Sequence, residues 1–148
     1  MDLIHNTKHY VSLPAAVYAK SGGPVTGTPV DRFGSERALI QFFSAALGTQ
    51  VNVYTLELVE ADLIGGPYTA VDDAYMIPIS GAEAAAQLEY HTSPSTLDES
   101  NTIKLFEYVG SKRFIGANLI TPTGAGTGSG IVGAIIILAG LRNSVETP

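Results

Sequence analysis

The hydrophobic pattern of this chain is most informative in its last third. Apolar and polar residues alternate over residues 103–110 and again over residues 113–121, with a basic turn between them. This period of two predicts two strands that form a hairpin. Residues 131–139 are apolar on both faces, and their β-branched side chains favour a strand over a helix. We expect this last strand to lie in the centre of a sheet, covered by an opposing sheet or by another copy of the chain.

Upstream segments carry the same signal. In residues 51–61 apolar side chains occupy every second position, which predicts a half-buried strand. Residues 37–47 fit either a helix or a buried strand, and their paired phenylalanines favour the strand. Residues 15–20 and 74–79 predict two shorter strands, and Pro78 restricts the second of them to a sheet edge or a strand end.

One segment predicts a helix. Ser80 and Glu83 form the S-x-x-E pattern of a capping box ahead of an alanine-rich run, so we expect a short helix over residues 82–89. The alternative is a loop that leads into a further strand. Six or seven strands with turn residues between them, and at most one short helix, predict an all-β protein: an antiparallel, jelly-roll-like β-sandwich.

The chain of 148 residues is long enough for one domain with a sizeable core. We expect residues 1–14 to form an N-terminal arm, residues 15–141 the single sandwich domain, and residues 142–148 a polar tail. The longest apolar run, residues 130–141, is too short for a membrane-spanning helix, so no membrane contact is expected.

Composition narrows the functional class. Charged residues make up 15% of the chain, against roughly 25% in an ordinary soluble domain. A surface with so few charges suits a chain that packs against neighbours. The net charge of −6 and the scattered basic residues argue against a phosphate-binding surface, so no direct contact with nucleic acid is expected. The absence of cysteine excludes disulfides and Cys-based zinc sites.

Candidates for catalytic or metal chemistry all have simpler structural explanations. A phosphate-binding loop needs a following helix or a lysine, a calcium loop needs a D-x-D-x-D-G pattern, and a histidine pair needs a third ligand. A nucleophilic serine needs a G-x-S-x-G elbow. We therefore expect no catalytic residue, no metal ligand, no cofactor and no enzymatic activity. The candidates that lack these features are the loop 124–130 for phosphate, the pairs Asp72–Asp73 and Asp98–Glu99 for calcium, His5 with His9 for another metal, and Ser129 as a nucleophile.

Several motifs resemble those of small virion proteins of tailed bacteriophages. They are YVGSKRF at 108–114, LITPTG at 119–124 and GIVGAIIILAG at 130–140, preceded by VDRFGSER at 30–37 and LELVEA at 56–61. The resemblance implies a capsid decoration, or cement, protein on the virion head surface, made in the host cytoplasm. Such proteins bridge major capsid subunits as homo-oligomers, commonly trimers. A head–tail connector or tail component of the same virion is the alternative.

Contacts with a partner are expected at the N-terminal arm, the basic turn and the last strand. Lys112 and Arg113 either keep the end of a hairpin soluble or form an intersubunit salt bridge. The expected interface residues are Tyr10, Val11, Tyr108, Lys112, Arg113, Ile131, Ile135 and Ile137.

A function of another class is also compatible with a jelly roll. A carbohydrate-binding module needs exposed aromatic rings that stack on sugars. The residues that could supply them are Tyr54, Tyr68, Tyr75 and Tyr90.

Overall fold

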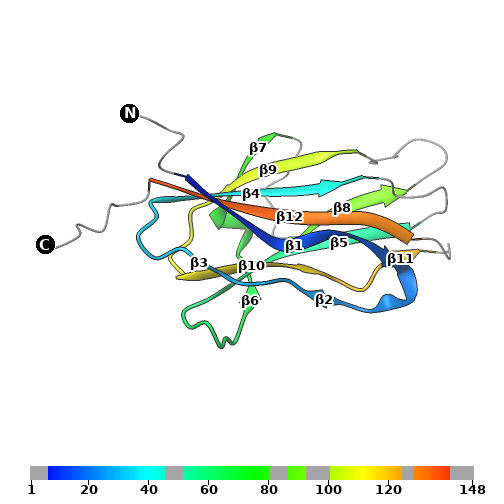
Figure 1. Cartoon of the computed structure of the whole chain (residues 1–148), viewed down its shortest axis with the longest axis horizontal. Helices are drawn as coiled ribbons and strands as arrows, with labels where there is room; N and C mark the ends of the chain where they lie inside the picture. Colours follow the sequence, from blue (N-terminus) through cyan, green and yellow to red (C-terminus); the bar gives the residue numbers. More distant parts are fainter. Residues whose placement is uncertain (1–6, 46–51, 81–86, 93–100, 125–128, 141–148) are drawn as a thin grey trace, which may run out of the picture.

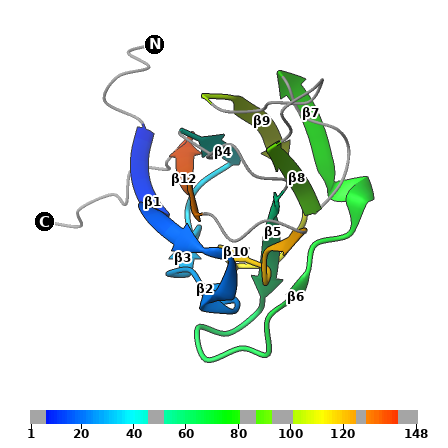
Figure 2. The ribbon, with the colours of Figure 1, turned by 90° about the vertical axis from the view of Figure 1, so that its right-hand side faces the viewer.

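A computed structural model describes residues 7–45, 52–80, 87–92, 101–124 and 129–140. Within these ranges the chain forms twelve strands, two short 3-10 turns, η2 (Lys20–Gly22) and η3 (Asp73–Tyr75), and no α-helix. The strands build two antiparallel sheets that pack against each other (Figures 1 and 2). The all-β sandwich that the sequence predicts is confirmed.

The first sheet has five strands and contains both the first and the last strand of the chain. Its order is β1 (Thr7–Ala19), β12 (Ser129–Ala139), β4 (Arg37–Ser44), β9 (Ile103–Tyr108) and β7 (Met76–Ser80).

The second sheet is built around β5 (Asn52–Ala61). β10 (Phe114–Leu119) and β11 (Thr123–Gly124) pair with one side of β5. β8 (Gln87–Thr92) and β6 (Thr69–Ala70) pair with its other side. The two short strands β2 (Val25–Thr26) and β3 (Val30–Asp31) follow the outer side of β10.

The strand order is that of a jelly roll. The sandwich has eight principal strands when β2 and β3 count as one interrupted strand and β6, β7 and β11 are not counted. The first sheet then places the first, eighth, third and sixth of them side by side, as β1, β12, β4 and β9. The second sheet places the second, seventh, fourth and fifth side by side, as β2/β3, β10, β5 and β8. Two interlocked Greek keys give this order. β7 is an additional strand at the edge of the first sheet, beside β9.

The core lies between the two sheets, because each strand turns every second side chain inward. Phe42 and Phe106 meet there edge to face, with ring centroids 5.1 Å apart. The inward residues of β12 are apolar and at most 2% exposed. They are Val132, Ala134, Ile136 and Leu138.

The last strand occupies an interior position, as expected, because it pairs with β1 on one side and β4 on the other. Its outward residues Ile131, Ile135 and Ile137 are half-buried. The opposing sheet therefore covers one face of β12, and the second face remains open on the single chain.

The predicted hairpin is wrong, and the predicted helix is wrong from Gln87 onward. Residues 103–110 and 113–121 do not form a hairpin: β9 pairs with β4 and β7, whereas β10 pairs with β5 in the other sheet. The turn between them carries the chain across the sandwich. Part of the predicted helix, residues 82–89, lies outside the described residues, but from Gln87 onward the chain is β8, so the alternative of a further strand is correct there.

The first strand begins earlier than the sequence predicts. β1 starts at Thr7 and pairs with β12 from Thr7↔Ala139 onward, so residues 7–14 belong to the sheet and not to an arm. Two bulges, between Val11 and Leu13 and between Leu13 and Ala16, break the alternation that would have revealed one continuous strand. The edge position predicted from Pro78 is confirmed, since β7 is the last strand of its sheet.

Candidate interaction surface

The outward side of the five-stranded sheet is the most distinctive surface of the described chain. Residues directly opposite each other in antiparallel strands point to the same side of the sheet. The register therefore places side chains in rows across the five strands. The rows are His9–Ile137–Leu39–Glu107–Ile77, Val11–Ile135–Gln41–Leu105–Ser80, Gly133–Phe43–Ile103, and Val17–Ile131.

We call these residues the outer sheet face. Most of them are apolar, and several are well exposed: Val11 is 59% exposed, Val17 65% and Ile103 54%. Ile77 at the edge is 46% exposed. The strand pattern is thus apolar on both sides of the sheet, which is unusual for a sheet whose second side meets water.

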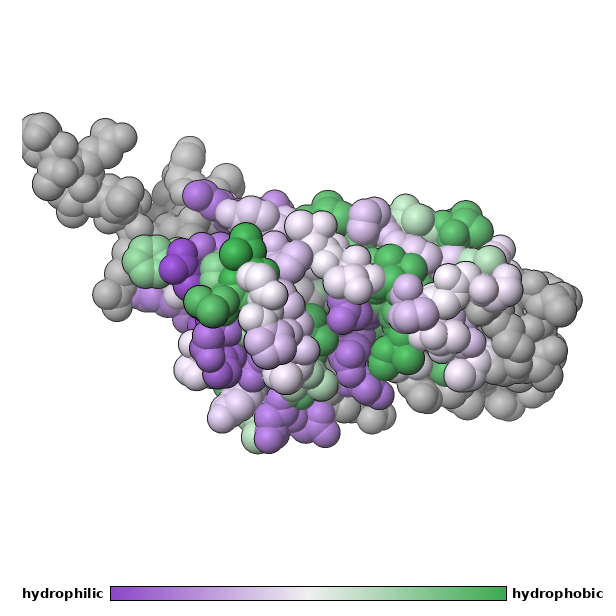
Figure 3. Space-filling model, turned by 90° about the horizontal axis from the view of Figure 1, so that it is seen from below, coloured by the Kyte–Doolittle hydropathy of each residue, from purple (hydrophilic) through white to green (hydrophobic). Residues whose placement is uncertain are grey.

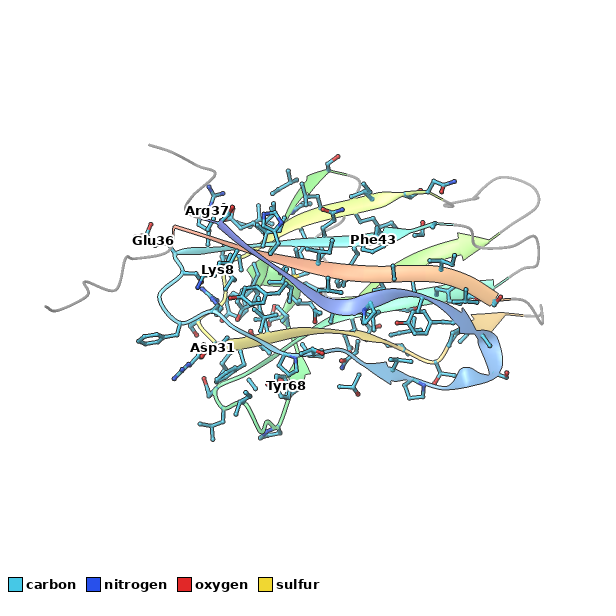
Figure 4. All side chains as sticks on the ribbon, viewed as in Figure 1. Lys8, Asp31, Glu36, Arg37, Phe43 and Tyr68 are labelled. Atoms are coloured by element: carbon cyan, nitrogen blue, oxygen red, sulfur yellow. The ribbon has the colours of Figure 1, made fainter. Side chains whose placement is uncertain are left out.

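Glu107, the charged residue in these rows, forms an ion pair with Arg37 of the same chain. Arg37, at the start of β4, donates from Nε and Nη2 to the two carboxylate oxygens of Glu107, at 2.6 and 2.7 Å. Figure 4 shows Arg37 and Phe43 toward opposite ends of β4. The Arg37 hydrogen bond lowers the pKa of the Glu107 carboxyl, so this carboxylate stays ionised and paired.

Phe43 packs closely over Gly133 on the outer sheet face. A Cβ atom at Gly133 would lie 2.6 Å from Cζ of Phe43, and 3.1 Å from both the Leu13 oxygen and the Ala15 nitrogen. The glycine lets the Phe43 ring and the bulged backbone of β1 approach β12 closely. This accounts for a glycine in the middle of an otherwise branched strand.

The outward side of the other sheet is different. Its register forms a polar row, Thr26–Asn118–Glu57–Gln87, in which Gln87 donates to Glu57 at 2.7 Å. Asn118 accepts a hydrogen bond from the Gly27 amide. Figure 3, seen from the side of β2 and β6, shows hydrophilic and hydrophobic residues interspersed. Among the described residues the two sides of the sandwich therefore differ: the outer sheet face is mostly apolar, and the opposite side is mixed.

The structure places four of the eight expected interface residues on the outer sheet face. Val11 and the three isoleucines of β12 lie on it. Tyr10 is half-buried and packs against the core instead. The face also includes residues that the sequence analysis did not single out, among them Val17, Phe43 and Ile103. The alternation within each strand could have identified them once their neighbours across the sheet were known.

Tyr108 is not available to a partner, contrary to the sequence prediction. Its side chain is 1% exposed, and its hydroxyl donates a hydrogen bond to Oε2 of Glu60 on β5. The guanidinium of Arg32 lies 4.8 Å from the Tyr108 ring centroid and donates to the Gly110 carbonyl. Burial, and then the hydrogen bond to Glu60, raise the pKa of the Tyr108 hydroxyl. The group connects the two sheets at one end of the sandwich.

Lys112 and Arg113 lie in the turn that crosses between the sheets, and each pairs with a carboxylate of its own chain. Lys112 Nζ lies 2.6 Å from Asp62 Oδ2. Arg113 forms two hydrogen bonds with Asp31, at 2.7 and 2.9 Å, and lowers the pKa of that carboxyl. The Arg113 guanidinium also contacts the rings of Phe33 and Phe114, at 4.9 and 5.1 Å from their centroids.

A second group of exposed apolar side chains lies in the turns that follow β3 and β5. Phe33 is 78% exposed, and Leu63 and Ile64 are 68% and 71% exposed. Two shallow hollows flank Lys112, one lined by Phe33 and the other by Leu63. We call Phe33, Leu63 and Ile64 the loop-end surface. None of these residues was expected at an interface, although large apolar residues inside polar and glycine-rich turns are a signal for exposure.

The other sequence candidates show no site among the described residues, where no group of three potential metal ligands comes together. His9 is exposed on β1, and Asp72 accepts a hydrogen bond from the Ala74 amide at 2.9 Å as the cap of η3. His5, Asp98, Glu99 and most of the loop 124–130 lie outside the described residues.

The tyrosines considered for sugar stacking are dispersed. Tyr54 is fully buried, Tyr75 is 44% exposed, and the Tyr68 hydroxyl donates to the Ile64 carbonyl. Figure 4 shows Tyr68 away from the five-stranded sheet. Tyr54 is thus not available to a sugar, and the side chain of Tyr90 lies outside the described ones.

In the ranges that the structure describes, no helix is long and apolar enough to cross a membrane. Comparisons with protein-family models, curated proteins and solved structures found no match.

Proposed function

We propose that this protein is a structural subunit of a bacteriophage virion, a capsid decoration protein that bridges major capsid subunits on the head surface. The observation that carries the proposal is the presence of two separate exposed apolar surfaces on one small jelly roll. A subunit that cements a lattice needs at least two contact surfaces, one for each neighbour that it joins.

The energetics of such a role suit these surfaces. Burial of apolar area contributes about 25 cal/mol per Å² before the entropic cost of association. A modest contact at each site is multiplied by repetition on a symmetric shell. The jelly roll itself occurs in viral capsid proteins and also in lectins, so the fold alone does not select the function. The motifs around the crossing turn and β12, which resemble those of virion proteins, favour the capsid role.

The test is quantitative mass spectrometry of purified particles of the phage whose genome encodes this chain. We expect hundreds of copies per particle. Six or twelve copies would instead support the neck or tail role, and absence from washed particles would refute a virion function.

A rebinding experiment tests the loop-end surface as the capsid contact. Particles that lack the chain are mixed with purified protein and sedimented. We expect the double variant Phe33→Ser/Ile64→Ser to lose most of its binding. The control is Thr26→Ala, which changes the polar side of the other sheet and should bind as the wild type does.

A further inference from the structure

We propose that the outer sheet face packs against the same face of a second copy, so that the protein is a two-fold symmetric dimer. This inference deepens the proposed function, because it names the partner of one of the two apolar surfaces. The contact itself is a property of the isolated chain, and it is measured without any capsid.

The area of the face matches what a stable dimer requires. Strands rise about 3.3 Å per residue and lie about 4.8 Å apart, so the five strands cover on the order of 700 Å². A standard protein interface buries about 800 Å² on each partner.

Charge favours a second copy over a charged partner. The chain carries a net charge of −6, so two copies repel each other over most of their surfaces. This repulsion is absent at the outer sheet face, because Arg37 neutralises Glu107 within the chain. Two such faces meet without burying an unpaired carboxylate, which is the costly event in an interface. A strongly acidic or basic partner would find no unpaired charge among the described residues of the rows.

The geometry of the face is suited to packing sheet on sheet. Open sheets pack about 10 Å apart, with strand directions within about 30° of each other. A face-to-face contact of identical surfaces closes on itself as a dimer. The predicted assembly is therefore a dimer, in place of the trimer that the resemblance implies.

Sedimentation equilibrium of the full-length protein at micromolar concentrations tests the inference. We expect a dimer for the wild type. The variant Val11→Lys/Ile103→Lys places four charges in the contact, and its dissociation constant should rise at least about ten-fold. Both positions are more than half exposed, so the fold should tolerate lysine, which circular dichroism checks.

The control is Thr26→Lys, which adds one lysine to the exposed polar side of the other sheet. It should leave the dimer intact. A wild-type monomer at all concentrations, a trimer, or a dimer that survives Val11→Lys/Ile103→Lys would each overturn the inference.

A second measurement uses the absence of cysteine from the natural chain. The single-cysteine variant Val11→Cys should react with a maleimide more slowly as protein concentration rises, whereas Thr26→Cys should react at a constant rate. Equal concentration dependence at both positions would contradict the proposed contact. A dimer found for a chain that is absent from virions would refute the proposed function and leave this inference standing.

Discussion

The hydroxyl of Ser12 accepts a hydrogen bond of 2.9 Å from the amide of Ala117 and so links β1 to β10 in the opposing sheet. The same hydroxyl donates to the Thr28 carbonyl at 2.8 Å, and the Thr28 amide donates to the Ser12 carbonyl at 2.7 Å. Ser12 is fully buried. One small side chain of the first sheet therefore satisfies two backbone groups of the second, in β10 and between β2 and β3, where the sandwich closes at the side of β1.

Replacement of Ser12 tests this link. Ser12→Ala leaves the buried Ala117 amide without its acceptor, and we expect the free energy of unfolding to fall by about 1–3 kcal/mol. Chemical denaturation measures the change. The control is Ser21→Ala at an exposed position, which should change stability by less than about 0.5 kcal/mol. Equal midpoints for wild type and Ser12→Ala would show that the link is energetically neutral.

The packing of Phe43 over Gly133 leads to a second prediction. Gly133→Ala forces the Phe43 ring and the β1 backbone to move, and such overpacking costs about 1–3 kcal/mol of stability. In a Phe43→Ala background the added methyl group meets only the backbone atoms, so the cost should be smaller. A double-mutant cycle measures this coupling. Gly22→Ala, where a Cβ meets no atom within 4 Å, is the control. Additive effects of the two changes would contradict the contact.

Tyr108 supports a prediction for alkaline pH. Tyr108→Phe deprives the buried Glu60 carboxylate of a donor, and hydrogen bonds to charged groups are worth about 1.5–3 kcal/mol. Burial raises the pKa of folded Tyr108 above the value of about 10 in an unfolded chain. The stabilisation is therefore fully present below about pH 10 and is lost as the pH rises through the folded-state pKa.

Unfolding followed at a series of pH values checks both parts of this prediction. The wild type should lose stability above about pH 10 more steeply than Tyr108→Phe does. The exposed Tyr75 provides the control Tyr75→Phe, which should keep the wild-type pH dependence. Parallel curves for wild type and Tyr108→Phe would rule out the proposed linkage.

The sequence was a good guide to which segments are strands, and a poor guide to which strands are neighbours. Alternation reports the side to which a residue points, and β5, β9 and β10 were recognisable for that reason. It does not report the partner strand, so the two strands around the basic turn were paired with each other although they belong to different sheets. The capping-box pattern at Ser80 is a local signal, and the pairing of β8 with β5 overrides it from Gln87 onward.

The candidate surface was predictable in part for the same reason. The two apolar faces of β12 indicated a covered outer side, and Val11 and the isoleucines follow from that. Tyr108 was misplaced because it stands just before the basic turn, whereas its ring belongs to the core and its hydroxyl bonds to Glu60, which is distant in the sequence. Phe33 and Leu63 lie in different turns, and each lines a separate hollow beside Lys112, which the sequence does not indicate.

The Arg37–Glu107 pair gives the prediction for acidic pH. Because the Arg37 hydrogen bond lowers the pKa of folded Glu107 below the unfolded value of about 4.3, the stabilisation is present above that value and is lost as the pH falls through the folded-state pKa. Glu107→Gln should therefore be less stable than wild type near neutral pH, by less than the core substitutions above, and the difference should vanish in acid. High salt should also reduce the difference, because Arg37 is largely exposed.

Unfolding of dilute protein, in the Val11→Lys/Ile103→Lys background, separates this effect from dimerisation. Arg37→Lys keeps the charge but loses the two-pronged contact, so its stability should lie between those of wild type and Glu107→Gln. The difference in stability between wild type and Glu107→Gln could instead persist unchanged through the acidic range. Replacement of the carboxylate by an amide would then act through packing and not through charge. The pair would then connect β4 and β9 through van der Waals packing. Its neutral charge would no longer explain why this face binds a second copy.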